Sequence, residues 1–595
     1  MDSVLFRSPA AVLKEVFGYN AFRQHQESIV SALLNRQDCL AILPTGSGKS
    51  LCYQLPALCM PGVTLVISPL IALMEDQVMQ LQKMGVSATV LNSSQSSFDN
   101  ARVLNTLSAY KLIYVSPERV AMPGFFDAFA PGELAMVVVD EAHCISQWGH
   151  AFRPEYRLLS AIKTRFPTVP VAAFTATATR DVAADIVSQL GLMAPFQVLG
   201  ALDRENLTIT VKERSNAKQQ LLDCLSQHPQ EACIVYAGTR KRVDQYHEFL
   251  NQNGFAAVKY HAGLSDGARQ KAQRDFVADD VSIIVATVAF GMGINKPDVR
   301  LVCHLDMPKN MEQYYQEIGR AGRDGLPAEC VLLFSVQDAI LQKQLSEDLP
   351  ATIKHHQFRK TDQMLAYCNA TDCRRKVLLH YFNETYPHET CGQCDVCTHP
   401  IAWMDGTVIA QKILSCIYRL ENRFGLSTVV DVLAGAQTAS IASRGHDKLS
   451  TYGLLKEHPK HDIRGWVFAL INLDYILCTD GDYPVLKLTP KAKSVLVGGQ
   501  TVQFKQTQPR PGRSRKPKAT MAFTENTSLL AQLKALRKTL ADKLGVPPYV
   551  VFHDKTLHEM ASVRPQTPEA FLEISGVGPA KLRQFGTAFL GILNP

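Results

Sequence analysis

The stretch "CLAILPTGSGKS", residues 39 to 50, places a short apolar run directly before a glycine-rich loop. The run has the length of a buried strand, and the residues after the loop continue with the pattern of a helix. In that setting the glycines let backbone N–H groups surround a phosphate, while Lys49 adds positive charge and the Ser50 hydroxyl can bind magnesium. Leu43 stands where the full P-loop pattern has its first glycine. The surrounding strand and helix therefore favour a nucleotide site over a coincidental turn.

The same alternation of apolar runs and helix-length segments extends from about residue 38 to residue 340. Apolar runs separated by helices are typical of parallel strands that are buried on both faces of a sheet. A polar segment, residues 200 to 215, divides about ten such runs into two sets of about five. We therefore expect an α/β fold with two successive doubly wound domains.

A second apolar run, "AMVVVDEAH", ends in two acids that suit the other half of a nucleotide site. Asp140 can hold magnesium through water, and Glu141 can act as the general base that activates the attacking water. On their own, two solvated acids at a strand end would be an ordinary surface feature. Their combination with the phosphate loop favours the catalytic interpretation.

Two arginines in "QEIGRAGRDG", residues 316 to 325, belong to the second set of strands and helices. Arg320 and Arg323 are three residues apart, close to one helical turn, so both can face one cleft. An arginine placed beside a transferred phosphoryl group can contribute about 10³ to 10⁵ in rate. Because these arginines would come from the second domain, ATP hydrolysis would depend on closure of the two domains.

Four of the 15 cysteines are clustered. Cys391, Cys394 and Cys397 lie in "CGQCDVC", and Cys373 lies 18 positions before the first of them. Four thiolates can form a closed tetrahedral zinc site, which would be structural, although the C-x₂-C-x₂-C spacing alone also permits an iron–sulfur cluster. The nearby Cys368 is expected to be structural.

The length and composition set the limits for the whole chain. A chain of 595 residues should form roughly four domains. No apolar stretch is long enough to cross a membrane and the first residues lack signal-peptide features, so we expect an intracellular protein. The net charge of +7 permits a polyanionic partner without requiring one. Residues 501 to 520 contain six basic residues, three prolines and no acid, which predicts a flexible basic linker.

Together these motifs resemble those of superfamily 2 helicases and, more closely, the bacterial type of the RecQ family of DNA helicases. The resemblance extends through most of the chain and rests on "FGYNAFRQHQ", "LPTGSGKS", "SPLIALMEDQV", "DEAH", "FTATAT", "ATVAFGMGINKPDVR" and "QEIGRAGRDG". It implies two RecA-like parallel-sheet domains, a helical zinc-binding subdomain, a winged-helix (RQC) domain and a small all-α HRDC bundle. The expected boundaries, in chain order and with the basic linker before the last domain, are 1–205, 206–340, 341–403, 404–500, 501–524 and 525–595.

The resemblance also implies roles for individual residues. Tyr19 would stack on adenine, and Arg23 and Gln26 would form hydrogen bonds with its edge. The threonines from Thr175 to Thr177 would connect the nucleotide state to the second domain. The implied nucleotide-binding set is Tyr19, Arg23, Gln26, Thr45, Gly46, Ser47, Gly48, Lys49, Ser50 and His143. The implied metal ligands are Ser50 and Asp140 for magnesium, and Cys373, Cys391, Cys394 and Cys397 for zinc.

The segment "CISQWGHAFRPEY", residues 144 to 156, would be the aromatic-rich loop of this family, between the ATP site and the groove for single-stranded DNA. Trp148 and Phe152 would stack on bases, and each such contact costs about 1 to 3 kcal/mol to remove. Arg153 would pair with a phosphate or stack. The alternative is that the aromatic residues, Tyr156 among them, form a core patch beneath a loop.

Three further places could contact DNA. In the expected HRDC bundle, Tyr549 and Lys581 are candidates for single-stranded DNA, although a packing role for the tyrosine is equally compatible with the sequence. Beside the cysteine cluster, Arg374 and Arg375 could touch DNA or be solvated. The turn "GDYPVL", residues 481 to 486, would be the wing of the winged-helix domain, and its shortness leaves open whether it separates strands.

The whole pattern predicts an ATP-dependent DNA helicase that moves 3′ to 5′ on single-stranded DNA and unwinds duplexes in DNA repair, recombination and replication. Its cofactors would be ATP, Mg²⁺ and Zn²⁺. The expected partners are single-stranded DNA, forked or partially duplex DNA and a single-stranded DNA-binding protein. We expect no membrane association, a monomeric motor and a cytoplasmic, nucleoid-associated location.

Two alternatives to this function are considered. The first is an RNA helicase of the same superfamily, against which the accessory modules count. The second is a nucleotide-gated DNA-binding scaffold without turnover, against which the intact Lys49, Glu141 and arginine pair count.

Overall fold

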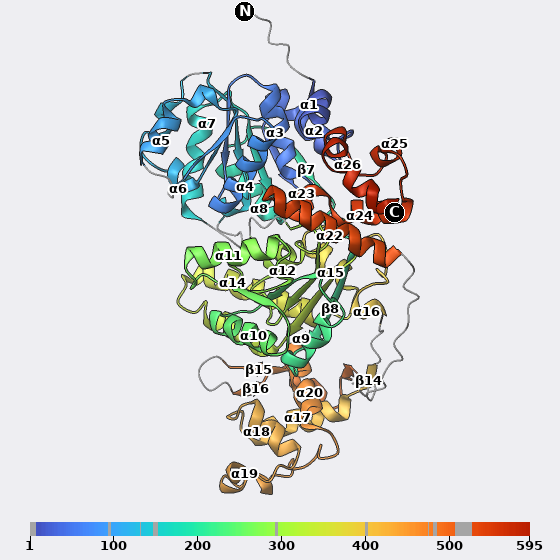
Figure 1. Cartoon of the computed structure of the whole chain (residues 1–595). Coiled ribbons are helices and arrows are strands. Elements are labelled where there is room, and N and C mark those ends of the chain that lie inside the picture. The colour runs from blue at the N-terminus through green and yellow to red at the C-terminus, as the bar shows by residue number, and fades with distance from the viewer. Residues whose placement is uncertain are drawn as a thin grey trace, which may run out of the picture. The chain divides into compact units, whose positions relative to one another are not determined.

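The chain forms two compact units. Figure 1 labels its helices and strands. The computed structural model describes residues 8–92, 97–130, 132–146, 153–291, 296–398, 403–473, 475–479, 485–505 and 526–594. One unit contains residues 1–334, 374–391 and 522–595, and the other contains residues 335–373 and 392–521. Within the described ranges, no helix has the length and apolar character needed to cross a membrane.

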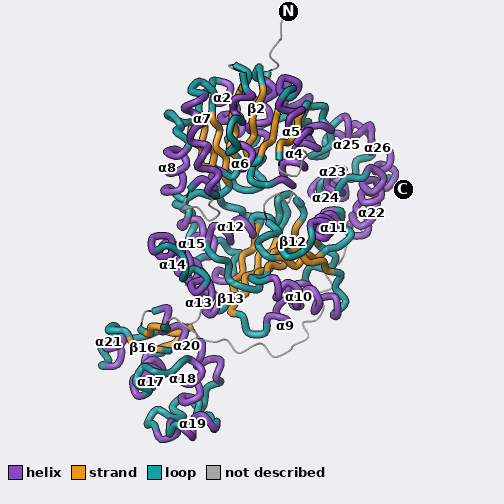
Figure 2. Tube along the Cα trace, turned by 90° about the vertical axis from the view of Figure 1, so that its left-hand side faces the viewer, coloured by secondary structure: helices purple, strands orange, loops and turns teal. Residues whose placement is uncertain are grey.

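The first domain is a seven-stranded sheet in which every pair of neighbours is parallel. Its strands, in spatial order, are β3 (Ala88–Leu91), β4 (Leu112–Val115), β2 (Val63–Ile67), β5 (Leu134–Val139), β6 (Val171–Thr175), β1 (Cys39–Ile42) and β7 (Phe196–Leu199). Separate apolar cores cover its two faces, and Figure 2 shows helices on both sides of the strands. One face packs against α2 (Gln26–Leu34), α3 (Lys49–Cys59) and α4 (Ile71–Lys83), and the other against α5 (Ser97–Leu104), α7 (Ala161–Arg165) and α8 (Arg180–Gln189).

The second domain is a parallel sheet of six strands. In spatial order these are β10 (Ala257–Tyr260), β11 (Ile283–Ala286), β9 (Ala232–Tyr236), β12 (Val299–His304), β13 (Ala328–Phe334) and β8 (Leu207–Glu213). Its helices include α9 (Ala217–Leu225), α10 (Arg240–Gln252), α11 (Asp266–Val277) and α12 (Met311–Ile318). Residues of α9 and α10 pack with the central strands into one apolar core.

The prediction of two doubly wound domains is confirmed, with larger sheets than the apolar runs indicated. All ten apolar runs form strands, and β3, β7 and β8 are additional. Strand β8 lies inside the segment 200–215 that we expected to be a polar break. Its residues alternate between buried and partly exposed positions, because it lies at the edge of the sheet. An edge strand does not need a continuous apolar sequence.

The remaining modules are smaller. Residues 335–398 are mostly helical, with α13 (Val336–Gln344), α14 (Ala351–Asn369), α15 (Arg374–Tyr381) and α16 (Asp395–Thr398). The winged-helix region packs α17 (Thr407–Arg419), α18 (Leu426–Leu433) and α20 (Lys460–Asn472) around one core, with the antiparallel pairs β15 (Ile476–Cys478) with β16 (Leu486–Leu488) and β14 (Trp403–Asp405) with β17 (Gln503–Lys505). Most of the expected wing, residues 481–484, and most of the expected linker lie outside the described residues.

The C-terminal bundle is entirely helical, as expected. Its elements are α22 (Asn526–Leu544), α23 (Pro548–Val551), α24 (Asp554–Val563), α25 (Pro568–Leu572) and α26 (Pro579–Leu593). Phe552 lies at the centre of its core and contacts the rings of Phe571, Phe585 and Phe589.

Candidate active site

The phosphate loop connects β1 to α3. Gly46 and Gly48 have φ angles of +84° and +83°, in the left-handed region that glycine adopts without strain. Gly48 is the N-cap of α3, so the loop ends at a helix N-terminus, which favours a bound phosphate. A Cβ atom at position 48 would lie 2.5 Å from Nε2 of Gln26. The backbone conformation therefore favours glycine there, and any side chain would also displace the Gln26 amide from its place beside the loop.

The residues expected to bind adenine lie against the same loop. Nε2 of Gln26 donates to the Ser47 carbonyl at 3.1 Å, and Nη1 of Arg23 donates to the Gly46 carbonyl at 3.0 Å. Oε1 of Gln26 also accepts from the backbone N–H of Arg23 at 2.9 Å. Tyr19 is 51% exposed, which leaves its ring accessible to a base. The structure thus brings Arg23 and Gln26 to the phosphate loop, whereas no contact of the described residues joins Tyr19 to that loop.

Lys49 is the first residue of α3, and its ammonium group points back into the loop. It donates to the carbonyls of Leu43 and Pro44, at 3.0 and 3.4 Å. Burial lowers the pKa of Lys49, and the negative charges of Glu141 and Asp140 act in the opposite direction. The lysine and the two acids therefore form one electrostatic group.

The two acids follow β5 directly. Burial and, to a smaller extent, the neighbouring charge of Glu141 together raise the pKa of Asp140 to about 7. Burial also raises the pKa of Glu141, and three nearby cations oppose that shift. The Oε2 atom of Glu141 is buried and has no hydrogen-bond partner among the described residues. Together with the Ser50 hydroxyl at the start of α3, these carboxylates offer the oxygen ligands that Mg²⁺ prefers, so the residues fit a magnesium site.

Two arginines of the second domain lie beside the phosphate loop of the first. Arg320 and Arg323 follow α12, and burial lowers the pKa of Arg323 to about 9, with the charge of Arg320 adding to the shift. A Cβ atom at Gly46 would lie 3.7 Å from Cβ of Arg323, and Oγ1 of Thr45 donates to the Gly319 carbonyl at 2.9 Å. The predicted meeting of phosphate loop, acids and arginines is therefore present in the structure.

A chain of polar contacts leads from the acids to the second domain. Nδ1 of the buried His143 lies 2.9 Å from Oγ1 of Thr175 and 3.4 Å from Oε2 of Glu141. Burial lowers the pKa of His143 to about 3, so its ring is neutral near pH 7. Nε2 of Gln316 donates to Oγ1 of Thr177 at 3.4 Å. Gln316 was not among the predicted site residues, and its place in "QEIGRAGRDG" was the only signal that could have indicated it.

The expected aromatic-rich loop is described only at its ends. Trp148 and Phe152 lie outside the described residues. Arg153 is half-buried, with Nη1 at 3.4 Å from Oε1 of Glu118. Tyr156 is fully buried in the core beneath the first sheet. For Tyr156 the core-packing alternative is therefore correct.

The two HRDC residues expected to contact DNA are both half-buried. Tyr549 stacks on His553, and burial raises its pKa. The ammonium of Lys581 lies 5.2 Å from the ring centre of Phe552, and burial lowers its pKa. The bundle also contacts the second domain, since Nζ of Lys538 donates to Oδ1 of Asp280 at 2.8 Å. Nothing in the sequence indicated this last contact.

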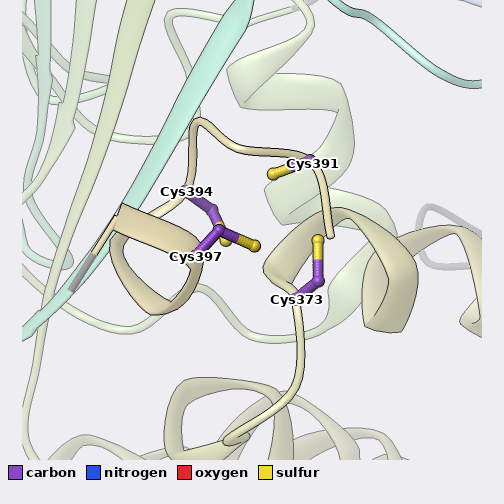
Figure 3. A group of neighbouring side chains, drawn as sticks. All are labelled: Cys373, Cys391, Cys394 and Cys397. Atoms are coloured by element: carbon purple, nitrogen blue, oxygen red, sulfur yellow. The ribbon is translucent and has the colours of Figure 1, made fainter. Parts of the chain in front are cut away.

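The four clustered cysteines converge on one point. The sulfur atoms of Cys373, Cys391, Cys394 and Cys397 all lie within 4.8 Å of one another, and Figure 3 shows them directed toward a common centre. Four sulfurs at about 2.3 Å from a zinc ion lie about 3.8 Å apart, so this arrangement fits tetrahedral zinc without an open position. Cys368 is buried and is not part of the group.

The two arginines beside the cysteine cluster are buried, and one of them has a role that the sequence did not suggest. Arg374 and Arg375 are both buried, at 3% and 4% exposure, so neither is solvated. Nη1 of Arg375 lies 3.0 Å from Oδ1 of Asp203, and its Nη2 donates to the Leu207 carbonyl at 2.8 Å. Arg375 therefore secures the start of the second domain.

Comparison with known proteins identifies each part of the chain. Family models match at residues 23–186 (DEAD/DEAH box helicase), 216–325 (helicase conserved C-terminal domain), 336–398 (RecQ zinc-binding), 400–512 (RQC domain) and 526–593 (HRDC domain). The ATP-dependent DNA helicase RecQ of Haemophilus influenzae is 42% identical, over 100% of this chain and 97% of its own length. That of Bacillus subtilis is 43% identical, over 98% and 97%.

A phosphate loop and acid pair on one parallel sheet, facing two arginines from another, define a two-domain helicase motor. The five matching modules and the full-length relatives then show the family: the chain belongs to the RecQ helicases and is an ATP-dependent DNA helicase. The predictions of family, fold class and enzyme class are confirmed.

Proposed function

We propose that this helicase moves 3′ to 5′ along single-stranded DNA and unwinds forked or partially duplex DNA in repair, recombination and replication. The observation that carries the proposal is the approach of Arg323 to the phosphate loop at Gly46, because it brings an arginine of the second sheet to the loop that would bind the phosphates of ATP. The direction of movement follows from the family resemblance. The motor acts as a monomer, in the cytoplasm on the nucleoid, and a single-stranded DNA-binding protein is its expected partner.

The residues divide the work of ATP hydrolysis between the two domains. Lys49 and the glycines of the loop bind the phosphates, and Glu141 accepts the proton of the attacking water. Arg320 and Arg323 stabilise negative charge that develops on the γ-phosphate. A magnesium ion held by Ser50 and Asp140 would neutralise charge on the phosphates.

Nucleotide and DNA recognition use the remaining candidates. Tyr19 stacks on adenine, while Arg23 and Gln26 move from the loop carbonyls to its edge. Single-stranded DNA is contacted by Trp148 and Phe152 and by the residues Arg153, Tyr549 and Lys581. The cysteine cluster holds zinc, which organises the zinc-binding module of residues 336–398.

Unwinding and ATP hydrolysis measured together test this function. Duplexes with a 3′ or a 5′ single-stranded tail, made of DNA or of RNA, are compared at the same ATP concentration. We expect unwinding of the 3′-tailed DNA and ATP hydrolysis that single-stranded DNA increases strongly. Preference for the RNA duplex would favour the RNA helicase alternative, and unwinding of the 5′-tailed DNA alone would contradict the direction of movement.

Arg153→Ala should weaken the binding of single-stranded DNA and thereby reduce the stimulation of ATP hydrolysis by DNA. A hydrogen bond to a charged group is worth about 1.5 to 3 kcal/mol, so we expect at least a tenfold loss of DNA-stimulated ATP hydrolysis at subsaturating DNA. The affinity for ATP, measured by fluorescent nucleotide binding, should change less than twofold. Arg165→Ala is the matched control, because Arg165 is an exposed arginine of the same domain that pairs with Asp127. Loss of ATP binding in Arg153→Ala would show instead that the loop is a structural element of the nucleotide site.

A further inference from the structure

Tyr156 lies beneath the end of the aromatic-rich loop and contacts the catalytic strand. Its side chain has 0% exposure and packs in the core of the first domain. Its hydroxyl donates to the main-chain carbonyl of Asp140 at 3.1 Å. The hydroxyl of a buried tyrosine could donate its hydrogen bond to any nearby acceptor. Here the acceptor belongs to the peptide group that joins the two catalytic acids.

That peptide group is held at both ends. The Asp140 carbonyl accepts from Tyr156, and the Glu141 N–H donates to Oδ1 of Asp140 at 3.0 Å. Glu141 has a φ angle of +47°, which is uncommon for a residue other than glycine and needs support from its surroundings. The orientation of this peptide therefore determines where the Glu141 carboxylate lies.

The same tyrosine belongs to a closed ring of hydrogen bonds around the loop. The N–H of Cys144 donates to the Glu141 carbonyl at 2.9 Å, and the N–H of Arg153 donates to the Cys144 carbonyl at 2.9 Å. The N–H of Tyr156 donates to the Arg153 carbonyl at 3.1 Å, and its hydroxyl completes the ring at Asp140. The bond between Cys144 and Arg153 joins the two ends of the loop.

We propose that Tyr156 is a positioning residue that transmits the state of the aromatic-rich loop to Glu141. A DNA phosphate that draws Arg153 outward pulls on the turn that carries Tyr156, and the hydroxyl turns the peptide ahead of Glu141. This inference rests on the proposed contact of the loop with DNA. Because general-base catalysis depends on geometry, a small displacement of Glu141 changes kcat more than it changes ATP binding.

Tyr156→Phe tests the proposal, since it removes the hydroxyl and keeps the ring. We measure ATP hydrolysis with and without a saturating oligothymidylate, the KM for ATP, and the affinity for the fluorescently labelled oligonucleotide by anisotropy. The expected result is a loss of about tenfold in DNA-stimulated kcat. The KM for ATP and the affinity for the oligonucleotide should each stay within twofold of the unchanged protein.

Tyr114→Phe is the matched control. Tyr114 is also buried in the first sheet, and its hydroxyl accepts from Nε2 of Gln54 at 2.9 Å. Both variants lose one buried hydroxyl and should lose similar thermal stability, but only Tyr156→Phe should lose stimulated kcat. Unchanged kcat in Tyr156→Phe, or an equal fall in both variants, would overturn the proposal. If the unchanged protein shows no stimulation by DNA, the proposed function itself fails.

Discussion

Glu141→Gln should reduce DNA-stimulated ATP hydrolysis by about 10³-fold while ATP still binds. Loss of a general base typically costs 10²- to 10⁴-fold, and glutamine keeps the shape of the side chain without accepting the proton. Burial raises the pKa of Glu141, so the charged carboxylate is unfavourable for folding at this position and the neutral amide should not lower stability. Steady-state hydrolysis, fluorescent ATP binding and thermal unfolding measure the three effects.

The control for this variant is Glu133→Gln. Glu133 directly precedes β5, the strand that Glu141 follows, and its carboxylate accepts only from the Ala130 N–H among the contacts of the described structure. The Glu133→Gln variant should hydrolyse ATP at the same rate as the unchanged protein. A Glu141→Gln variant that hydrolyses ATP within tenfold of the normal rate would assign the general base to another residue. Loss of ATP binding would mean that Glu141 mainly organises the nucleotide site.

Removal of zinc should unfold the module of residues 336–398. Cys394→Ser takes one sulfur from the four-cysteine cluster, and Cys394 itself is 1% exposed. A structural zinc site can contribute about 10 kcal/mol or more to folding. Without zinc, the module should therefore lose more free energy than its folded state has over the unfolded state. Metal analysis should show about one zinc per chain in the normal protein and far less in the variant. Limited proteolysis should cut the variant within this module.

Cys368→Ser provides the comparison for the zinc experiment. Cys368 is buried close by in α14, yet it is not part of the cluster. The Cys368→Ser variant should keep its zinc and should resist the protease as the unchanged protein does. Full zinc content in Cys394→Ser would show that Cys394 is not a zinc ligand. Iron together with visible absorbance in the unchanged protein would show that the cluster binds iron and sulfide instead of zinc.

The sequence was most informative where chemistry and secondary structure coincide. Each apolar run formed a strand, and the phosphate loop and acid pair lie at the ends of β1 and β5, because a buried parallel strand needs continuous apolar residues. Strand β8 was missed because an edge strand is exposed on one side and carries polar residues at alternate positions. A search for continuous apolar runs identifies the central strands, but it cannot identify an edge strand in which apolar and polar residues alternate.

Contacts between distant residues were beyond the sequence. Arg375 pairs with Asp203 far along the chain, and nothing in either local sequence indicates the other. Tyr156 lies 16 residues after Asp140, and only the folded return of the loop places its hydroxyl on that carbonyl. Residue types at a given spacing can suggest which side chains are reactive. The residue types and their spacing do not specify which peptide groups hold the reactive side chains in place.

Gly48 is subject to two independent constraints, and this limits how the phosphate loop can evolve. The backbone at +83° disfavours any side chain, and Gln26 occupies the space that a Cβ atom would need. Shortening Gln26, 22 positions earlier, would relieve only the second constraint and would remove its hydrogen bond to the loop. A substitution at position 26 could therefore make room for a side chain at position 48, but it would leave the unfavourable backbone conformation unchanged.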